Sequence, residues 1–418
     1  MDVKRSVVES PRDLRAIAFY LPQFHPIPEN NEWWGPGFTE WRNVALARPL
    51  FPGHYQPHVP ADLGYYDLRL PEVREAQAEL ARRNGIHGFC YYHYWFNGRR
   101  ILERPFAEVL ASGKPDFPFC LCWANENWTR VWDGGEQNVL LQQHYSAEDD
   151  LAHIRALIPA FADPRYIRID GRPLLLVYRT ELLPDPARTA KIWRTEACRA
   201  GMGDLYLARV ENFVSRVNPA SIGFDAAVEF APLGAQVGKV KFQGTMHRLL
   251  ARLGLLSRAF TDNRVTTYRA LMAGMLAKPD PGFKRFRCVT PMWDNTARRR
   301  TGANVYIGST PELYATWLSE LARQTVDKFA PEEQIVFVNA WNEWAEGCHL
   351  EPDLKWGRRY LEATKAALDG VRDTAAGTRT AAPAPGRSYP GVKRLYWRAR
   401  AFLAEQRELL NNLLGRPG

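Results

Sequence analysis

The sequence predicts a single (β/α)8 barrel of the TIM type, in which eight parallel strands alternate with helices around one core. Three observations support this fold class. Eight short and almost continuously apolar runs are spaced along residues 16–341, which is typical of strands buried on both faces. Segments with helix start and stop signals separate these runs. No glycine-rich phosphate loop follows the first run, which disfavours the alternative of a doubly wound open sheet.

The expected strands contain mainly aliphatic, aromatic and cysteine side chains, and each is five to eight residues long. Runs of this length suit buried strands better than helices. In chain order they cover residues 16–21, 88–95, 117–123, 173–178, 205–210, 226–230, 288–293 and 335–341.

Several expected helices begin with proline or a capping residue. Pro71 and Glu72 begin one helix, because proline fits the first turn and an acidic side chain there interacts favourably with the helix dipole. Ser146, Asp185 and Thr310 are each suited to cap a further helix, since their side-chain oxygens can accept a backbone N–H. These signals place helices before the second, fourth, fifth and eighth strands.

Two parts of the chain depart from the alternation. A basic insertion, residues 239–269, separates the sixth and seventh expected strands. After the barrel, which we expect to cover residues 1–370, residues 371–391 have the Ala, Thr, Pro and Gly content of a flexible linker. Residues 392–418 then have the pattern of a basic amphipathic helix. We therefore expect a catalytic barrel, a linker and a C-terminal helix.

Most of the net charge lies in this C-terminal part. The chain has 55 Lys and Arg against 46 Asp and Glu, a formal charge of +9. Residues 371–418 contain nine basic and three acidic side chains, which is +6 and leaves +3 for the rest. A nearly balanced barrel without a nucleic-acid motif argues against nucleic-acid binding. The basic helix suits an anionic membrane surface or a partner protein, and a solvated helix packed on the barrel is the alternative.

The composition is that of a globular protein, with 46% hydrophobic and 24% charged residues. No apolar run reaches the roughly 18 residues of a membrane span, and the N-terminal MDVKRSVVESPRDLR lacks the apolar core of a secretory signal. We therefore expect a cytoplasmic protein that the C-terminal helix could hold at the inner face of the membrane. Cys90, Cys120 and Cys122 lie in expected strands, and we expect neither a metal nor another cofactor.

Aromatic side chains occur together with Asn, Asp or Glu near the ends of five or more expected strands. In a barrel, the carboxyl ends of the strands form the face that carries the active site. Aromatic rings stack on the C–H patches of a pyranose, and carboxylates and amides bind its hydroxyls, so this combination predicts a sugar site. Any one of these aromatics, taken singly, is more often part of the core. The expected sugar-binding residues are Tyr20, Gln23, Trp41, Tyr92, Trp95, Trp123, Asn125, Glu126, Glu229, Asp294, Asn342 and Trp344.

Glu343 and Glu346 are three residues apart, directly after the eighth strand, and are flanked by Trp341 and Trp344. Glycoside cleavage uses two carboxyl groups, one as proton donor to the leaving oxygen and the other at the anomeric centre. Two carboxylates held close together also raise one pKa, which keeps a proton available near neutral pH. We therefore predict that both are catalytic, with a solvated pair on a loop as the alternative. Glu351 is expected to be a structural hydrogen-bond partner.

Residues 341–352 (WNEWAEGCHLEP) resemble a motif of the WbsX-like proteins, relatives of glycoside hydrolase family 99 that are often labelled glycosyltransferases of O-antigen and polysaccharide loci. The resemblance spans about residues 16–361 and does not include the basic tail. Further similar stretches are residues 19–25 (FYLPQFH), 37–41 (GFTEW), 56–58 (QPH), 62–67 (DLGYYD) and 123–126 (WANE).

This resemblance implies a (β/α)8 barrel that acts with retention at an α-mannoside-like linkage, through a 1,2-anhydro sugar. On this basis Glu343 deprotonates the 2-hydroxyl of the sugar, and Glu346 serves as general acid and then as general base. The related hydrolases have His between the two glutamates, whereas this chain has Ala345.

We expect a retaining glycosidase or transglycosidase that acts on a bacterial surface polysaccharide or its precursor. One alternative is a glycosyltransferase of polysaccharide assembly, which fits the expected cytoplasmic location. A second alternative is a non-catalytic carbohydrate-binding protein that uses the same aromatic and acidic residues without turnover.

Overall fold

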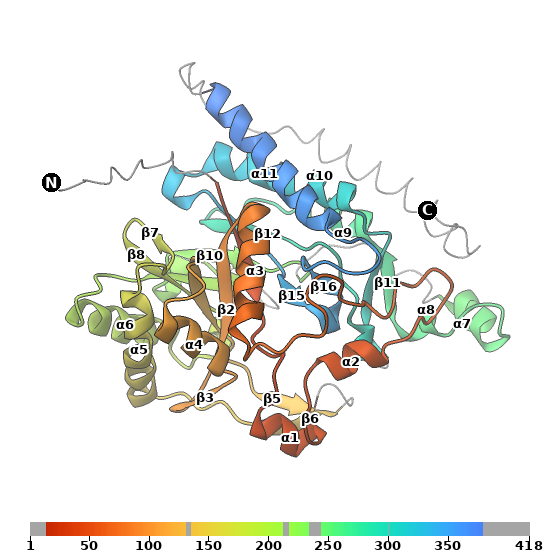
Figure 1. The fold of residues 1–418 in the computed structure, drawn as a ribbon, viewed down its shortest axis with the longest axis horizontal. Coiled ribbons are helices and arrows are strands. Elements are labelled where there is room, and N and C mark those ends of the chain that lie inside the picture. Colours follow the sequence, from red (N-terminus) through yellow and green to blue (C-terminus); the bar gives the residue numbers. More distant parts are fainter. Residues whose placement is uncertain (1–13, 131–134, 212–216, 234–243, 300, 379–418) are drawn as a thin grey trace.

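The eight predicted strands form a closed, entirely parallel barrel surrounded by helices (Figure 1). The barrel strands are β1 (Arg15–Tyr20), β2 (Ile86–Phe96), β4 (Phe119–Trp123), β8 (Arg172–Val177), β9 (Tyr206–Glu211), β10 (Ala226–Glu229), β12 (Arg285–Val289) and β14 (Ile335–Val338). β1 pairs with both β2 and β14, so the last strand closes onto the first. The predicted (β/α)8 barrel is therefore confirmed.

The structure is a computed structural model, and it describes residues 14–130, 135–211, 217–233, 244–299 and 301–378. The expected C-terminal helix, residues 392–418, lies outside the described residues. Within them, no helix is both long enough and apolar enough to cross a bilayer.

The predicted capping residues begin the helices as expected. The side chains of Ser146, Asp185 and Thr310 each accept a hydrogen bond from the backbone N–H three residues further on. Such a bond satisfies one of the donors that the first turn of a helix leaves unpaired. The helices around the barrel are α3 (Pro71–Arg83), α4 (Arg104–Ser112), α5 (Ala147–Ala162), α6 (Pro186–Arg199), α9 (Tyr268–Leu276), α10 (Pro311–Lys328) and α11 (Arg359–Thr378).

The barrel has an aromatic interior and a second apolar layer beneath the helices. The ring of Phe19 on β1 lies 5.2 Å from that of Phe230 and 5.5 Å from that of Phe337, so it points into the barrel. The next residue, Tyr20, faces outwards, and its hydroxyl donates to Gln77 on α3 at 2.7 Å. Both faces of the strands are buried, as the nearly continuous apolar runs predicted.

Shorter strands and helices lie in the loops that connect the barrel elements. Two short antiparallel strands follow β14; the first carries Glu343, and the 3-10 helix between them carries Glu346. A separate parallel pair, β11 with β13, lies outside the barrel. These elements are α1 (Pro28–Trp34), α2 (Trp41–Leu46), α7 (Thr245–Arg252), α8 (Ala259–Asp262), β3 (Arg99–Ile101), β5 (Trp128–Arg130), β6 (Gly135–Leu141), β7 (Arg168–Ile169), β11 (Arg264–Thr267), β13 (Asn304–Ile307), β15 (Asn342–Glu343), the 3-10 helix η6 (Trp344–Glu346) and β16 (Cys348–His349).

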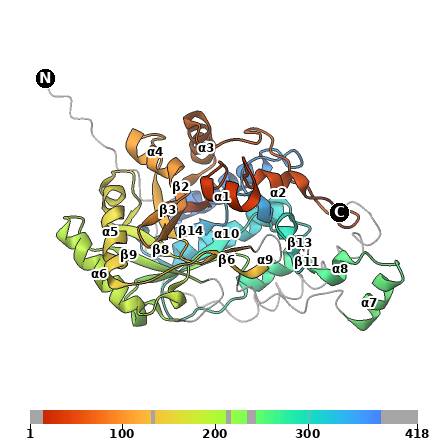
Figure 2. The same ribbon diagram turned by 90° about the horizontal axis from the view of Figure 1, so that it is seen from below.

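The described part of the basic insertion folds as α7, α8 and β11, ahead of α9. It packs on a small apolar cluster of its own, which is separate from the main core. The ring of Phe260 on α8 stacks on that of Phe51 at 4.3 Å, so the insertion is fixed to the loop that follows α2. The helices α7 and α8 of the insertion are visible at the edge of the molecule in Figure 2.

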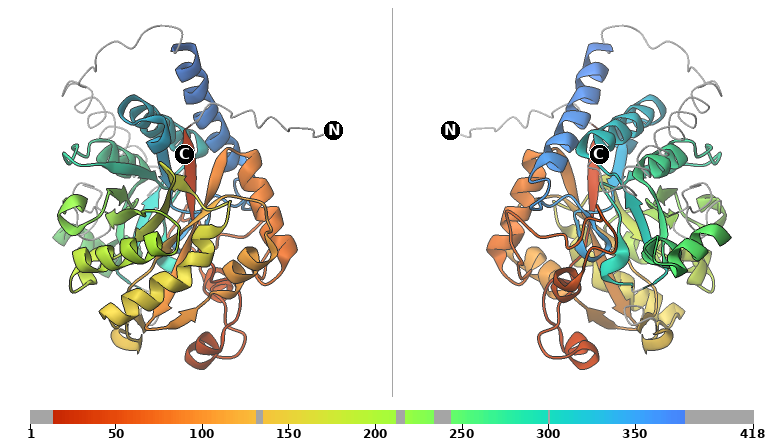
Figure 3. Two further views of the ribbon diagram at one scale, coloured as in Figure 1. Left: turned by 90° about the vertical axis from the view of Figure 1, so that its left-hand side faces the viewer. Right: turned by 90° about the vertical axis from the view of Figure 1, so that its right-hand side faces the viewer.

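α11 extends to Thr378, so the first residues expected to form the linker, from Val371, are helical instead. The guanidinium of Arg372 donates to the backbone oxygen of Leu14 at 2.9 Å, which ties this end of α11 to the residue before β1. The boundary expected at residue 370 therefore falls within a helix. The last turns of α11 project beyond the barrel (Figure 3).

Candidate active site

The two predicted catalytic glutamates lie beyond the carboxyl end of β14, on β15 and η6. Both contact the guanidinium of Arg298. Arg298 Nη2 lies 2.5 Å from Glu343 Oε1, and Arg298 Nη1 lies 3.0 Å from Glu346 Oε1. The same arginine donates through Nε to Glu40 Oε1 at 2.5 Å. The centre of the candidate site is therefore one arginine, with 14% of its side chain exposed, that contacts three glutamates.

Sequence reasoning did not identify Arg298 or Glu40 as site residues. Glu40 stands in the GFTEW stretch that contributed to the family resemblance, which was the available signal. Arg298 belongs to a run of three arginines after the seventh strand, and a run of this kind is usually solvated. Only the fold brings these two residues to the glutamates, since they lie far apart along the chain.

The environment favours retention of protons on these carboxyl groups. Burial raises the pKa of Glu343 well above its usual range, and the charges of Glu40 and Glu346 raise it further, while Arg298 opposes them. Burial also raises the pKa of Glu346, again against the effect of Arg298. Arg298 brings one positive charge to three carboxyl groups, so a fully ionised cluster would carry excess negative charge in a buried site.

A tight turn sets the position of Glu346. Gly347, the next residue, has a φ of +55°, and an added Cβ would lie 3.0 Å from the backbone oxygen of Asp294. The backbone N–H of Asp294 donates to the oxygen of Glu346 at 2.8 Å. Asp294 is itself held by His54, whose Nε2 lies 2.5 Å from its Oδ2. Asp294 thus supports the turn that carries Glu346, and this role differs from the sugar contact that was expected for it.

Asn342 joins the last strand to the first loop of the barrel. Its side-chain oxygen accepts from the backbone N–H of Leu21 at 2.8 Å, and its amide donates to the oxygen of Leu21 at 3.0 Å. Asn342 is fully buried. Its amide therefore braces the site and is not placed to bind a ligand.

Glu351 anchors the other side of the turn, as expected for a structural hydrogen-bond partner. It accepts bonds from Trp344 Nε1, Tyr66 Oη and Gln77 Nε2, at 2.7, 2.8 and 2.7 Å. Burial raises the pKa of Glu351 to about 7 despite these donors. Trp41 supports the same turn, because its ring lies 5.5 Å from that of Trp344 and its Nε1 donates to a backbone oxygen.

Two predicted sugar-binding residues lie near the glutamates. Tyr92 is partly exposed, and its ring stacks on that of Phe19. Burial is the main cause of its raised pKa, and the negative charge of Glu343 is a further cause, which places the two side chains near each other. Gln23 donates to the hydroxyl of Tyr94 at 2.9 Å. The charge of Glu343 also contributes, again after burial, to the raised pKa of Tyr94, so this tyrosine is a further member of the same wall.

Glu126 and Asn125 occupy another part of this end of the barrel. Glu126 forms an ion pair with Arg179 and keeps 38% of its side chain exposed, so its carboxyl can reach a ligand. Burial of its carboxyl raises the pKa of Glu126, whereas Arg179 lowers it. The side chain of Asn125 is bonded to the backbone N–H and oxygen of Arg179, both at 2.8 Å. Tyr178 lies close enough to Glu126 and Glu346 for both charges to contribute to its raised pKa, after burial.

Four predicted sugar-binding residues face the helices instead of the site. Tyr20 contacts α3, as described above. Trp95 donates to Asp149 on α5 at 2.9 Å, and the ring of Trp123 lies 5.7 Å from that of Trp193 on α6. Glu229 is fully buried beneath α9, where Arg287 and Lys278 form ion pairs with it at 2.9 and 3.0 Å. The structure therefore does not bring these four to the glutamates.

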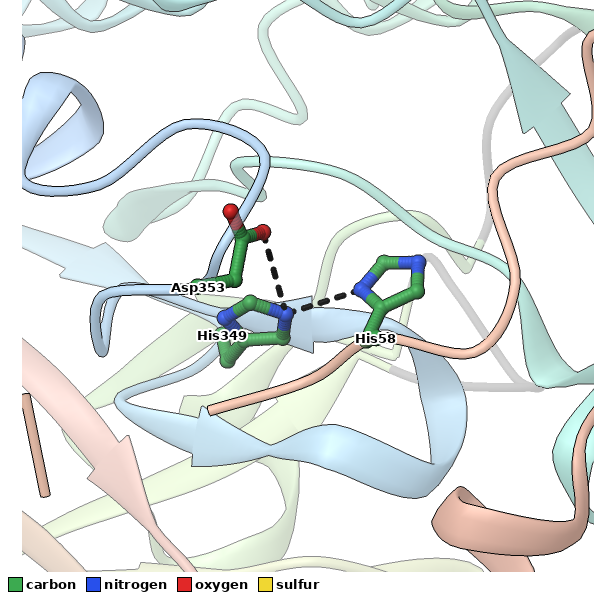
Figure 4. A group of neighbouring side chains, drawn as sticks. All are labelled: His58, His349 and Asp353. Carbon is green, nitrogen blue, oxygen red and sulfur yellow. Dashed lines mark hydrogen bonds and ion pairs between the residues drawn. The ribbon is translucent and has the colours of Figure 1, made fainter. Parts of the chain in front are cut away.

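The side chains of His58, His349 and Asp353 form a buried group (Figure 4), and His349 lies on β16, just after the turn that carries Glu346. One potential ligand atom from each lies within 4.8 Å of the other two. His349 Nδ1 is bonded to the oxygen of Glu351 at 2.9 Å, and its Nε2 lies 2.8 Å from His58 Nδ1. Both ring nitrogens of His349 therefore already take part in hydrogen bonds. The bond between His349 and His58 connects the segment around residue 58 to this turn. The ring of Trp344 stacks on His349 at 3.7 Å.

Comparison with known proteins places this geometry in context. The family described as Glycosyltransferase WbsX matches residues 16–364. The uncharacterized protein WxcX of Xanthomonas campestris pv. campestris is 45% identical over 359 residues, in each of two strains. The match covers 86% of this chain and 50% of the relative, so the chain spans about half the length of the curated relatives it matches.

Solved structures share the fold at low sequence identity. The chain is similar to a family 99 endo-alpha-mannosidase from Bacteroides thetaiotaomicron, with a TM-score of 0.53 and 15% identity, over 87% of this chain and 99% of that one. A glycoside hydrolase-like protein has a TM-score of 0.50 and 13% identity, over 85% and 94%. Because the family match covers most of its length, the chain belongs to the WbsX family.

Proposed function

We propose that the chain is a retaining glycosidase or transglycosidase that acts on a mannoside-like linkage of a bacterial surface polysaccharide or its precursor. The observation that carries this proposal is the contact of Glu343 and Glu346 with the same guanidinium, at the carboxyl end of a barrel. Two carboxyl groups held at one point are the requirement for this chemistry. The likeness to a family 99 endo-alpha-mannosidase supports the choice of linkage.

The two glutamates are suited to different roles. Glu346 has 21% of its side chain exposed and a raised pKa, so it can hold a proton and present it to a leaving oxygen. Glu343 has 8% of its side chain exposed, and burial raises its pKa as well. Its role as a base therefore depends on Arg298, which lies 2.5 Å away and favours the ionised form.

The proposed reaction has two steps. Glu343 takes the proton of the sugar's 2-hydroxyl, the oxygen attacks C1, and Glu346 gives its proton to the departing oxygen as the C1–O bond breaks. In the second step, water or an acceptor hydroxyl gives a proton to Glu346 and attacks C1. The bond between C1 and the 2-oxygen then breaks, and that oxygen recovers its proton from Glu343. The configuration at C1 is inverted twice and so retained.

Other residues of the site would bind the sugar. Tyr92 and Gln23 lie on one side of the glutamates, and Glu126 with Arg179 lies near Tyr178. Ala345 is fully buried, so the position between the two glutamates offers no side chain to a substrate. We therefore expect neighbouring-subsite contacts to come from the Glu126 region.

Replacement of Glu346 tests the proposal. Glu346→Gln should reduce turnover of host-derived surface oligosaccharides by about 10²- to 10⁴-fold, because general acid catalysis is lost. Binding of the same oligosaccharides, measured by calorimetry, should remain. Glu312→Gln is a matched control, since Glu312 is exposed on α10. Turnover by Glu346→Gln equal to that of the unchanged chain would exclude this role.

The family description favours a second candidate, a glycosyltransferase. Such an enzyme would bind a nucleotide-activated sugar, whereas the proposed glycosidase would not. Titration of the full chain with nucleotide diphosphate sugars distinguishes the two. A third candidate, a carbohydrate-binding protein, would bind the oligosaccharides and release no product on prolonged incubation.

A further inference from the structure

α7 and the turn after it carry an exposed apolar stripe, defined here as Met246, Leu249, Leu253 and Leu255. These side chains are 64%, 50%, 63% and 73% exposed. The first three lie at positions i, i+3 and i+7, which places them on the same face of a helix. Large apolar side chains gathered on one exposed helical face are typical of a surface that binds a protein or a membrane.

The stripe is exposed although a core is available beside it. Phe260 packs with Phe51, Val265 and Val305 in the small apolar cluster that anchors the insertion. The hydroxyl of Ser257 donates to the oxygen of Leu50 at 2.9 Å and fixes the turn to the barrel end. The segment is therefore held in place while its apolar face points outwards, and Figures 1 and 2 both show α7 at the periphery.

The charged side chains of α7 and of the turn after it are arginines, and the first acidic residue that follows is Asp262 on α8. Arg248, Arg252 and Arg258 are exposed, and residues 244–261 contain no Asp or Glu. Among the residues that the structure describes, none of these three arginines forms an ion pair. The surface therefore combines unpaired arginines with exposed leucines and methionine.

The combination of exposed apolar side chains and arginines favours one class of binding partner over the others. A second copy would bring the same arginines face to face, and the C-terminal residues 392–418 are also basic. An anionic bilayer accepts apolar side chains at the acyl boundary while its headgroups attract arginine. We propose that the stripe and Arg248, Arg252 and Arg258 form a docking surface for an anionic lipid membrane. Docking of this kind is independent of the reaction at Glu343 and Glu346.

Vesicle binding by the full chain tests the proposal. We expect co-sedimentation with vesicles of phosphatidylglycerol and phosphatidylcholine, weak binding to phosphatidylcholine alone, and weaker binding at high salt. A variant with serine at all four stripe positions should bind the anionic vesicles at least about tenfold less tightly, because the apolar area that enters the bilayer is lost. The variant R248Q/R252Q/R258Q should show a similar loss on anionic vesicles only.

A matched control uses exposed leucines elsewhere on the surface. Leu70, Leu182 and Leu354 are 52%, 39% and 70% exposed, and their triple replacement by serine should leave binding unchanged. Amide exchange measured by mass spectrometry locates the contact, because the amides of α7 should be protected only when anionic vesicles are present. The proposal is overturned if the stripe variant binds as well as the unchanged chain, or if binding leaves exchange in α7 unaltered. Binding through the tail or to a protein partner alone would give that result.

Discussion

Arg298 connects three acidic side chains that come from two separate parts of the chain, the segment around Glu40 and the turn after β14. Its Nε contacts Glu40, and its two terminal nitrogens contact Glu343 and Glu346. A buried group of like charges is unfavourable unless a cation compensates it. The guanidinium is suited to this position because its planar fork can hold several carboxylates in fixed directions.

We predict that Arg298→Met lowers the free energy of unfolding by about 3–5 kcal/mol at pH 7.5, because it leaves buried carboxylates uncompensated. The pKa values of Glu343 and Glu346 are already raised in the folded protein and should rise further without the arginine. The folded state then binds more protons than the unfolded state, so the loss should grow as the pH rises and be smaller at pH 5. Urea unfolding of the variant and of the unchanged chain at both pH values measures the difference in the free energy of unfolding.

Arg323→Met provides the control for this change. Arg323 pairs with Glu320 and Asp327 on the surface of α10, and pairs of this kind contribute about 0–1 kcal/mol. Equal losses in the two variants, or a loss that is the same at pH 5 and 7.5, would contradict the role of Arg298.

The direction in which a strand side chain points could not be predicted from the sequence. Phe19 points into the barrel, and its neighbour Tyr20 points towards α3. The strands are buried on both faces and so have no polar and apolar alternation that distinguishes the two directions. The same ambiguity explains why Trp95, Trp123 and Glu229 were expected at the site and lie beneath helices instead.

At the scale of elements, the turn formed by β15, η6 and β16 determines where the carboxyl groups of Glu343 and Glu346 lie. The sequence predicted the eighth strand and the two glutamates after it, and the structure places both at the end of the barrel. It did not indicate the supports from distant segments, such as Asp294 and its partner His54. Such contacts depend on how loops fold back over the barrel, which local patterns do not encode.

We predict that Gly347→Ala displaces Glu346 and destabilises the protein. The glycine has a φ of +55°, and an added Cβ would meet the backbone oxygen of Asp294 at 3.0 Å and its nitrogen at 3.2 Å. Gly357 has nearly the same φ, +54°, with nothing within 4 Å of an added Cβ. Gly357→Ala should therefore lose only the roughly 1–2 kcal/mol of a left-handed conformation, and Gly347→Ala more. Thermal unfolding and oligosaccharide turnover measure the difference, and similar values for both variants would contradict it.

At the scale of the whole molecule, α11 packs against elements from both ends of the barrel sequence. Its Tyr360 contacts Tyr314 on α10, with ring centres 5.6 Å apart, and Leu368 lies against the turn after α3 at Gly85. The alternation of strands and helices predicted the barrel because each unit is a local pattern. The end of the last helix was not predicted, because alanine and threonine allow both a helix and a linker.

We expect Leu368→Ala to lower the free energy of unfolding by about 2–5 kcal/mol, since Leu368 is fully buried. If α11 is part of the barrel's cooperative unit, circular dichroism and tryptophan fluorescence should give the same shifted transition. Leu354→Ala is the matched control, because Leu354 is 70% exposed and its loss should change stability by no more than about 0.5 kcal/mol. A transition confined to one probe would show that α11 unfolds by itself.

The contact of Arg298 with three glutamates also has a consequence for sequence divergence within the family. Loss of one acid still leaves two carboxyl groups on the arginine, whereas loss of the arginine leaves three carboxyl groups that repel one another. In a library that varies positions 40, 298, 343 and 346 together, folded members that keep two or three of the acids should therefore also keep the arginine. Relatives with a different substrate should have diverged first at positions outside this group, such as Glu126 and Arg179, where one ion pair can be exchanged without disturbing the centre.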